Sequence, residues 1–296
     1  MGGKMLTLSE TSNRPGDADA GLLASLSEDY NGSACRIGEA REMLLAIDVG
    51  NTNITLGVFE GERLRASWRL AADVSRLADE YGVLMVNLLD HEGIGSGQID
   101  AAVMASVVPD LDAIFEAVCR RYFGVRPLVV SAGVRTGLSI LYDSPREVGS
   151  DRVADAVAAI RLYGPPLILV DLGTATVFDA ISKDGDYLGG AIAPGLVIAA
   201  EALFQRAARL YRVELARPKK AIGQNTVAAV QSGVIYGYVA LVEGIVGRFK
   251  EELGEEAKVV ATGGWAELVG QETDVIDVVD PNLTLTGLRF IYEMNS

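Results

Sequence analysis

Two segments of the chain have a residue pattern that could bind phosphate. They are IDVGNTN at residues 47–53 and VDLGTAT at residues 170–176, and each is followed by a strand pattern and a turn, Glu60-Gly61 or Asp184-Gly185. Glycine lets backbone amides approach an anion, small polar side chains suit phosphate oxygens, and the aspartate can hold a hydrated Mg²⁺. Either segment alone could be an ordinary turn. Because the pattern occurs twice, it favours a pair of facing phosphate-binding hairpins.

The residue inventory excludes several other kinds of chemistry. The chain has two cysteines, Cys35 and Cys119, and a single histidine, His91. These leave no disulfide framework, no zinc-ligand spacing and no histidine-based catalytic triad. The G-x-x-x-x-G-K-[ST] loop is absent, and so is a G-x-G-x-x-G loop after a strand. The chemistry must therefore use carboxylates, hydroxyls, backbone amides and a bound cation.

Two further segments could complete a phosphotransfer site. Gly263-Gly264 follows a strand and precedes a helix, so it could be a tight turn or a place where a nucleoside lies close to the backbone. Asp151 begins a predicted helix, where a carboxylate could either stabilise the helix dipole or accept the proton of an alcohol. Arg152 beside it is a fork suited to a substrate carboxylate.

The elements that must position these residues alternate between short apolar runs and helical segments, which predicts an α/β fold. The repeat predicts two lobes, residues 44–160 and 161–296, with a cleft between them. We expect strands at 44–48, 54–59, 64–70, 101–106, 127–130, 167–171, 176–181, 258–261 and 275–278. We expect helices at 79–91, 109–123, 151–163, 197–210, 226–253, 265–269 and 283–294.

The overall composition limits the partners of the protein. With 26 basic and 40 acidic residues the net charge is −14, which argues against a nucleic-acid partner. No apolar run is expected to reach the 18 or more residues that a membrane span needs, so we predict no membrane contact. Residues 1–43 have no persistent periodicity and predict a disordered tail or an overlong gene start, with Met43 as the true initiator. They have no targeting pattern, which makes the cytoplasm the expected location.

The two repeated segments and residues 262–264 resemble the two phosphate motifs and the adenosine motif of the acetate and sugar kinase/actin superfamily. The sequence between them resembles one family in particular, the type III pantothenate kinases. This resemblance runs from Met43 to the C-terminus and rests on residues 68–70, 79–81, 106–109, 136–138, 142, 145–152, 189–195 and 222–226. It implies a duplicated actin-like (ribonuclease H-like) ATPase fold with a central cleft. The implied activity is ATP-dependent phosphorylation of pantothenate to 4'-phosphopantothenate, the first step of coenzyme A biosynthesis.

The resemblance also implies roles for individual residues. Asp151 matches the proton acceptor, Asp171 matches a ligand of a monovalent cation (K⁺ or NH₄⁺), and Asp48 is our candidate for Mg²⁺. The pantothenate contacts would be Tyr142, Gly149, Ser150, Asp151, Arg152 and Thr226. The ATP contacts would be Asp48, Val49, Gly50, Asn51, Thr52, Asn53, Ile54, Thr55 and Thr174, with Gly263 and Gly264 at the adenosine. In the family the threonine that corresponds to Thr226 comes from the neighbouring subunit, which implies a homodimer. Thr226 could otherwise be the N-cap of a long helix.

Three positions depart from the family pattern. Ser150 replaces an alanine, Val177 replaces the second threonine of a Thr-Ala-Thr-Thr run, and Tyr211 replaces a proline. None of the three removes an expected catalytic group, although Val177 removes a hydroxyl beside a phosphate loop. Two alternatives stay open at this point: a sugar kinase of the same superfamily, and a degenerate relative that binds nucleotide and regulates through protein contacts.

Overall fold

The computed structural model describes residues 42–207 and 210–296. The expected tail, residues 1–43, therefore lies outside the described residues except for its last two. Met43 begins the first strand.

The first half of the chain forms a five-stranded mixed sheet in the order β3-β2-β1-β4-β5. Strand β1 pairs antiparallel with β2 and parallel with β4. Strands β2 and β3 are antiparallel, and β4 and β5 are parallel. The strands are β1 (Met43–Val49), β2 (Asn53–Glu60), β3 (Arg63–Ala71), β4 (Ala101–Ser106) and β5 (Pro127–Val129).

The second half repeats this topology strand for strand. Its sheet has the order β10-β9-β6-β7-β8, which is the first sheet's order read from the other edge. Strand β6 again pairs antiparallel with the next strand and parallel with β9. The strands are β6 (Leu167–Leu172), β7 (Ala175–Ile181), β8 (Tyr187–Pro194), β9 (Lys258–Thr262) and β10 (Val278–Val279). The duplication expected from residues 47–53 and 170–176 is confirmed.

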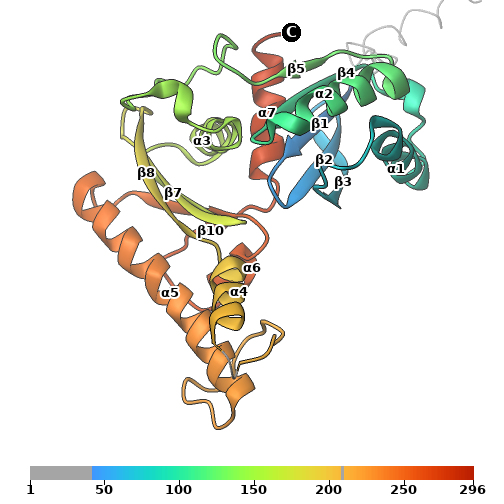
Figure 1. Cartoon of the computed structure of the whole chain (residues 1–296). Helices are drawn as coiled ribbons and strands as arrows, with labels where there is room; N and C mark the ends of the chain where they lie inside the picture. The colour runs from blue at the N-terminus through green and yellow to red at the C-terminus, as the bar shows by residue number, and fades with distance from the viewer. Residues whose placement is uncertain (1–41, 208–209) are drawn as a thin grey trace, which may run out of the picture. The chain divides into compact units, whose positions relative to one another are not determined.

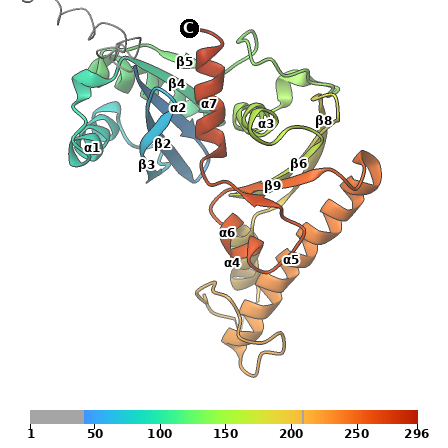
Figure 2. The ribbon, with the colours of Figure 1, turned by 180° about the vertical axis from the view of Figure 1, so that it is seen from behind.

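Helices cover the sheets in layers, as Figures 1 and 2 show from opposite sides. Helices α1 and α2 cover one face of the first sheet, α3 and α7 lie between the two sheets, and α5 and α6 cover the outer face of the second sheet. The bounds are α1 (Ala78–His91), α2 (Pro109–Val118), α3 (Ser150–Tyr163), α4 (Leu196–Arg206), α5 (Thr226–Leu253), α6 (Ala266–Gly270) and α7 (Leu283–Glu293). Helix α2 runs on into a π-helical turn (Cys119–Phe123), and short 3₁₀ turns cover Ser96–Gln98 and Pro145–Glu147.

The alternation of side chains along β1 and β6 decides where the repeated aspartates lie. Leu44 and Ala46 of β1 pack in the core around α3 and α7, whereas the alternate residues of this strand, Leu45, Ile47 and Val49, pack towards α1 and α2. Leu167 and Leu169 of β6 also belong to the core around α3 and α7. Since side chains alternate along a strand, Asp48 and Asp171 project towards the same middle layer. Both expected phosphate hairpins thus begin beside α3.

Helices α3 and α7 pack closely in this middle layer. A Cβ at Gly287 of α7 would collide with the backbone carbonyl of Ala154 in α3. Glycine at this position lets the two helices approach to backbone contact. The close approach fixes α3, which carries Asp151, against the helix that packs on β1 and β4.

Helix α5 corrects one expectation from the sequence. It has 28 residues, and by length and composition alone it could cross a membrane, contrary to the expectation that no apolar run is long enough. Its buried face includes Val239, Val242 and Val246, which pack on the second sheet. The absence of membrane contact and a cytoplasmic location stay predictions. The helix is capped by Asn225, whose side chain accepts a hydrogen bond of 2.9 Å from the Ala228 amide, so Thr226 is not the N-cap.

Several element bounds differ from those expected. Strand β8 was not expected, α4 ends at Arg206 rather than at 210, and the strand expected at 275–278 is the two-residue β10. The helix expected at 109–123 changes to a π-helical turn at Cys119.

Candidate functional site

Both repeated hairpins line a single cavity of about 400 Å³. The tip of the β1–β2 hairpin contributes residues 50–53, and the tip of the β6–β7 hairpin contributes residues 173–175. Asp48, Thr55 and Asp171, on the strands of these hairpins, also line the cavity. The hairpin tips touch, because the Thr174 hydroxyl donates a 2.9 Å hydrogen bond to the Thr52 hydroxyl. The structure therefore brings together most of the expected phosphate-binding residues. Val49 and Ile54 are the exceptions, with side chains fully buried in the core under α1 and α2.

The Gly263-Gly264 segment lies against the second hairpin. Gly263 has a φ of +93°, and a Cβ there would collide with the carboxylate of Asp171 and the backbone of Leu172. Both glycines line the cavity, and the backbone at Gly264 comes close to the Arg69 guanidinium. The third motif thus reaches the cavity because β9 pairs with β6, with Thr262 opposite Asp171.

Helix α3 adds two carboxylates to the cavity. Asp151 and Asp155 are four residues apart, so they share one face of the helix, and both line the cavity. Asp151 lies in the first turn and accepts a 2.8 Å hydrogen bond from the Arg152 amide. Asp155 is buried, and its Oδ1 has no hydrogen-bond partner among the described residues. The cavity thus holds a buried carboxylate with one unpartnered oxygen, at a residue that the sequence did not single out.

Burial and, after it, the neighbouring negative charges raise the pKa values of the carboxylates in this cavity. Burial, followed by the charges of Asp151 and Asp171, raises the pKa of Asp48 to about 8. Burial, followed by the charges of Asp151 and Asp179, raises the pKa of Asp171 to about 7. Burial is also the main cause that raises the pKa of Asp151 and of Asp155. Such a cavity favours a bound cation, which would compensate the negative charge.

The donor set fits the expected cations only in part. Among the described residues no group of three or more histidine, cysteine, aspartate or glutamate side chains could hold a metal ion. Mg²⁺ in phosphotransfer sites commonly takes one or two carboxylates and completes its shell with water and phosphate oxygens. Asp48 and Asp171, at the bases of the two hairpins, fit that pattern.

The acceptor-side residues form a separate cluster next to the cavity. Arg152 donates from Nε to Oδ1 and Oδ2 of Asp179 at 3.1 and 3.3 Å, and its Nη2 lies 2.5 Å from Oδ1. The Tyr187 hydroxyl donates to the same Oδ1 at 2.6 Å, and the Tyr142 ring packs edge-on against Tyr187 with centroids 6.5 Å apart. The structure thus brings Arg152 and Tyr142 together, but neither side chain lines the cavity. The expected fork for a substrate carboxylate is already bound to the buried carboxylate of Asp179.

Gly149 and Ser150 position α3 beside the cavity without lining it. Ser150 Oγ accepts a 3.0 Å hydrogen bond from the Ser106 amide and donates to the Ser106 carbonyl at 3.1 Å. These bonds join the first turn of α3 to the end of β4. The Ser150 hydroxyl, which departs from the family pattern, is therefore hydrogen-bonded to the backbone of Ser106. Gly149 lies so close to the Asp151 carboxylate that a Cβ there would collide with it.

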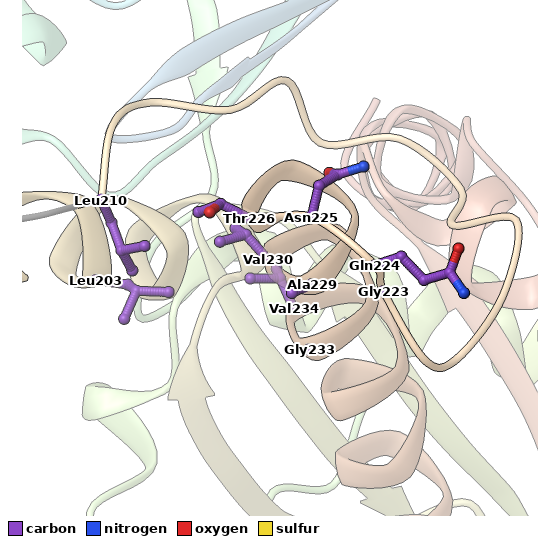
Figure 3. Close-up of a pocket in the computed structure, with 10 residues that line it drawn as sticks. All are labelled: Leu203, Leu210, Gly223, Gln224, Asn225, Thr226, Ala229, Val230, Gly233 and Val234. Carbon is purple, nitrogen blue, oxygen red and sulfur yellow. The ribbon is translucent and has the colours of Figure 1, made fainter.

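Thr226 lies apart from all of these residues. It lines a second pocket, of about 650 Å³, at the N-terminus of α5. Figure 3 shows Leu203 and Leu210 on one side of this pocket and the first turns of α5 on the other. Within one chain, Thr226 therefore does not belong to the cavity that contains Asp151.

Four site residues were missed by the sequence analysis for different reasons. Asp155 had a usable signal, since it follows Asp151 by one helical turn. Asp179 and Tyr187 gave no signal because their relation to Arg152 depends on how β7 and β8 pack against α3. Arg69 was noted only as part of the family pattern, and its position in the cavity depends on the pairing of β3 with β2.

Comparisons with known proteins give a family match and a shared fold. A family model described as type III pantothenate kinase matches residues 44–248. A solved structure of a conserved putative Baf family transcriptional activator from Campylobacter jejuni is 20% identical, with a TM-score of 0.55 over 85% of this chain and 98% of that chain. A putative 2-dehydro-3-deoxygalactonokinase from Sinorhizobium meliloti is 10% identical, with a TM-score of 0.51 over 85% of this chain and 96% of that chain. At these identities the structures establish the fold alone, which is the expected actin-like ATPase fold with duplicated lobes.

Proposed function

Because the chain belongs to the type III pantothenate kinase family, we propose that it transfers the γ-phosphoryl group of ATP to the primary alcohol of pantothenate. The product is 4'-phosphopantothenate, at the first step of coenzyme A biosynthesis. The observation that carries this proposal is that Asp151 lines the same cavity as the tips of both repeated hairpins. A base and a phosphate site in one cavity are what transfer to an alcohol requires.

The reaction is a single displacement. The hydroxyl oxygen of pantothenate forms a bond to the γ-phosphorus, the bond from that phosphorus to the β,γ-bridging oxygen breaks, and ADP leaves. Asp151 receives the hydroxyl proton. The raised pKa of Asp151, caused mainly by burial, suits a carboxylate that must take up a proton. Asp48, residues 50–53, Thr55, Thr174 and Gly263-Gly264 hold ATP, with Val49 and Ile54 in the core behind them.

The acceptor would be bound by the cluster around Arg152. Arg152 donates from Nε and Nη2 to Asp179, and its Nη1 donates to no described residue, which leaves that nitrogen for the pantothenate carboxylate. Gly149 and Ser150 lie at the start of α3 beside Arg152, and Tyr142 packs on Tyr187, which binds the same Asp179. Thr226 would come from a second copy of the chain, since its own pocket is separate. This makes the enzyme a homodimer, and a monomeric mass by light scattering would contradict that part of the proposal.

Cations would complete the site. Asp48 would hold Mg²⁺, and Asp171 a monovalent cation, K⁺ or NH₄⁺. When bound, these ions neutralise the phosphate charge that four aspartates would otherwise repel.

The proposal is tested by ADP release from ATP with Mg²⁺, with pantothenate compared against a panel of neutral sugars and K⁺ compared against Na⁺. We expect pantothenate-dependent turnover that K⁺ stimulates. Turnover with a sugar alone would indicate a sugar kinase. ATP binding without turnover on any acceptor would indicate a regulatory relative. Either result would overturn the proposal.

A further inference from the structure

Arg69 is a charged residue of the cavity that the proposed reaction does not use. It lies on β3, where alternate side chains are exposed, and it lines the cavity beside Asp48 and Asp171. Its Nη1 would lie 3.3 Å from a Cβ built at Gly264. The side chain therefore reaches from the first sheet to the glycine turn after β9.

Arg69 is the one basic side chain among the described residues that line this cavity. Those residues include five acidic ones, Asp48, Asp151, Asp155, Asp171 and Glu201. Burial raises the pKa values of both Asp48 and Asp171, and the charge of Arg69 opposes that rise, so this charge lies within electrostatic reach of the bases of the two hairpins. A polyphosphate that enters this cavity meets a surplus of negative charge and a single cation supplied by the described protein.

The guanidinium of Arg69 is also free to bind a ligand. Among the described residues it makes no hydrogen bond and no ion pair, in contrast to Arg65 on the same strand, which pairs with Glu60 at 2.7 Å. A guanidinium carries five donors in a planar fork that matches phosphate oxygens, and its charge is fixed at any physiological pH. An arginine that only balanced the aspartates would be expected to contact one of them.

We propose that Arg69, which lies opposite Thr55 in the β2–β3 pairing, binds the phosphate chain of the nucleotide. This inference rests on the kinase reaction proposed above. Arg69 would do what the lysine of the G-x-x-x-x-G-K-[ST] loop does in P-loop enzymes, and this sequence does not contain that loop. Glycine at position 264 leaves room for this guanidinium, because a larger side chain there would crowd it.

The test compares Arg69→Gln with Arg65→Gln. The two variants remove one positive charge each from the same strand, and Arg65 does not line the cavity. Isothermal titration with Mg²⁺ and either ADP or AMP measures affinity directly. We expect Arg69→Gln to weaken ADP binding about 10- to 100-fold and AMP binding less, since charged hydrogen bonds to phosphate are lost. Arg69→Lys, which keeps the charge without the fork, should fall between Arg69→Gln and the unmodified protein.

Steady-state kinetics provide a second readout. The KM for ATP should rise in Arg69→Gln, whereas the KM for pantothenate should not change. ADP affinity in Arg69→Gln equal to that in Arg65→Gln would overturn the inference, and so would an equal loss for ADP and AMP. Failure of the proposed function is distinguishable, because a protein that phosphorylates no acceptor still gives the ADP titration. Thermal unfolding of both variants checks that each is folded.

Discussion

At the scale of single residues, the site is defined by carboxylates that are close together and only partly compensated. Asp48, Asp151, Asp155 and Asp171 all line one cavity, and burial raises the pKa of each. A protein keeps such an arrangement at a cost in stability. The cost is understandable if a cation and a nucleotide occupy the cavity during function.

This cost predicts a pH dependence of stability. The pKa of Asp48 is raised from 3.8 to about 8, so the folded state binds a proton that the unfolded state releases over that interval. The stabilisation that this proton gives is complete below about pH 4 and is lost as the pH rises through about 8. We therefore expect Asp48→Asn to be more stable than the unmodified, ligand-free protein at pH 8, with the difference shrinking towards pH 4.

Urea unfolding between pH 4 and pH 9 measures the difference in free energy of unfolding. The matched control is Asp184→Asn, an exposed aspartate in the turn between β7 and β8. It should show no such trend. A difference for Asp48→Asn that is constant with pH, or that grows as the pH falls, would refute the assignment of a raised pKa.

At the scale of elements, α3 is the part that unites the two halves of the site. Ser150 ties its first turn to the end of β4, Arg152 ties it to Asp179 of β7, and Gly287 of α7 lies against its Ala154. The helix thus contacts both sheets and carries Asp151 and Asp155 on the face that lines the cavity. Its position therefore decides where Asp151 lies relative to the hairpin tips.

The tie between Arg152 and Asp179 makes a second prediction. Asp179→Asn leaves a largely buried guanidinium without its carboxylate, which we expect to cost about 2–4 kcal/mol of the free energy of unfolding. Tyr187→Phe removes only one hydrogen bond to the same carboxylate and should cost about 1 kcal/mol. Urea unfolding of both variants gives the comparison. If Asp179→Asn is no less stable than Tyr187→Phe, the ion pair does not fix α3.

Local sequence patterns predicted most of these elements, since buried strands such as β4 read as short apolar runs with polar ends. Strand β8 was missed because it is an edge strand with glycines inside it. Gly189 has a φ of +128° beside a bulge in the β7–β8 pairing, and a Cβ at Gly190 would collide with the Phe178 carbonyl. These glycines let the backbone of β8 lie close to that of β7, but they interrupt the alternation of apolar and polar residues by which a strand is recognised in a sequence.

The site was predictable where it follows from the repeat and not where it depends on packing. Asp48 and Asp171 could be paired because both close a strand in the same way. The sequence shows that Val177 departs from the family pattern, but it does not show which residue lies opposite. In the structure Val177 lies opposite Asp171 in the β6–β7 pairing, and the equivalent position in the β1–β2 pairing is Thr55, opposite Asp48. Arg69 and Asp179 come from strands whose neighbours are known only after the sheets have formed.

At the scale of the described part of the molecule, duplication explains the cavity. Two sheets with the same strand order present the same hairpin, and the helices between them are shared. The lobe limits 44–160 and 161–296 stay a prediction, since α7 from the end of the chain packs against β1, β2 and β4. The cavity requires both copies of the repeat together with α3.

The measurement that tests this account most directly is pantothenate-dependent ADP release by Asp151→Asn, alongside titration of the same variant with Mg²⁺ and ADP. The account predicts that turnover falls by about 10²-fold or more, because the alcohol proton loses its acceptor. It also predicts that ADP affinity stays close to that of the unmodified protein, because Asp151 holds no part of the nucleotide. Unchanged turnover in a folded Asp151→Asn protein would contradict the account and remove this carboxylate from the mechanism.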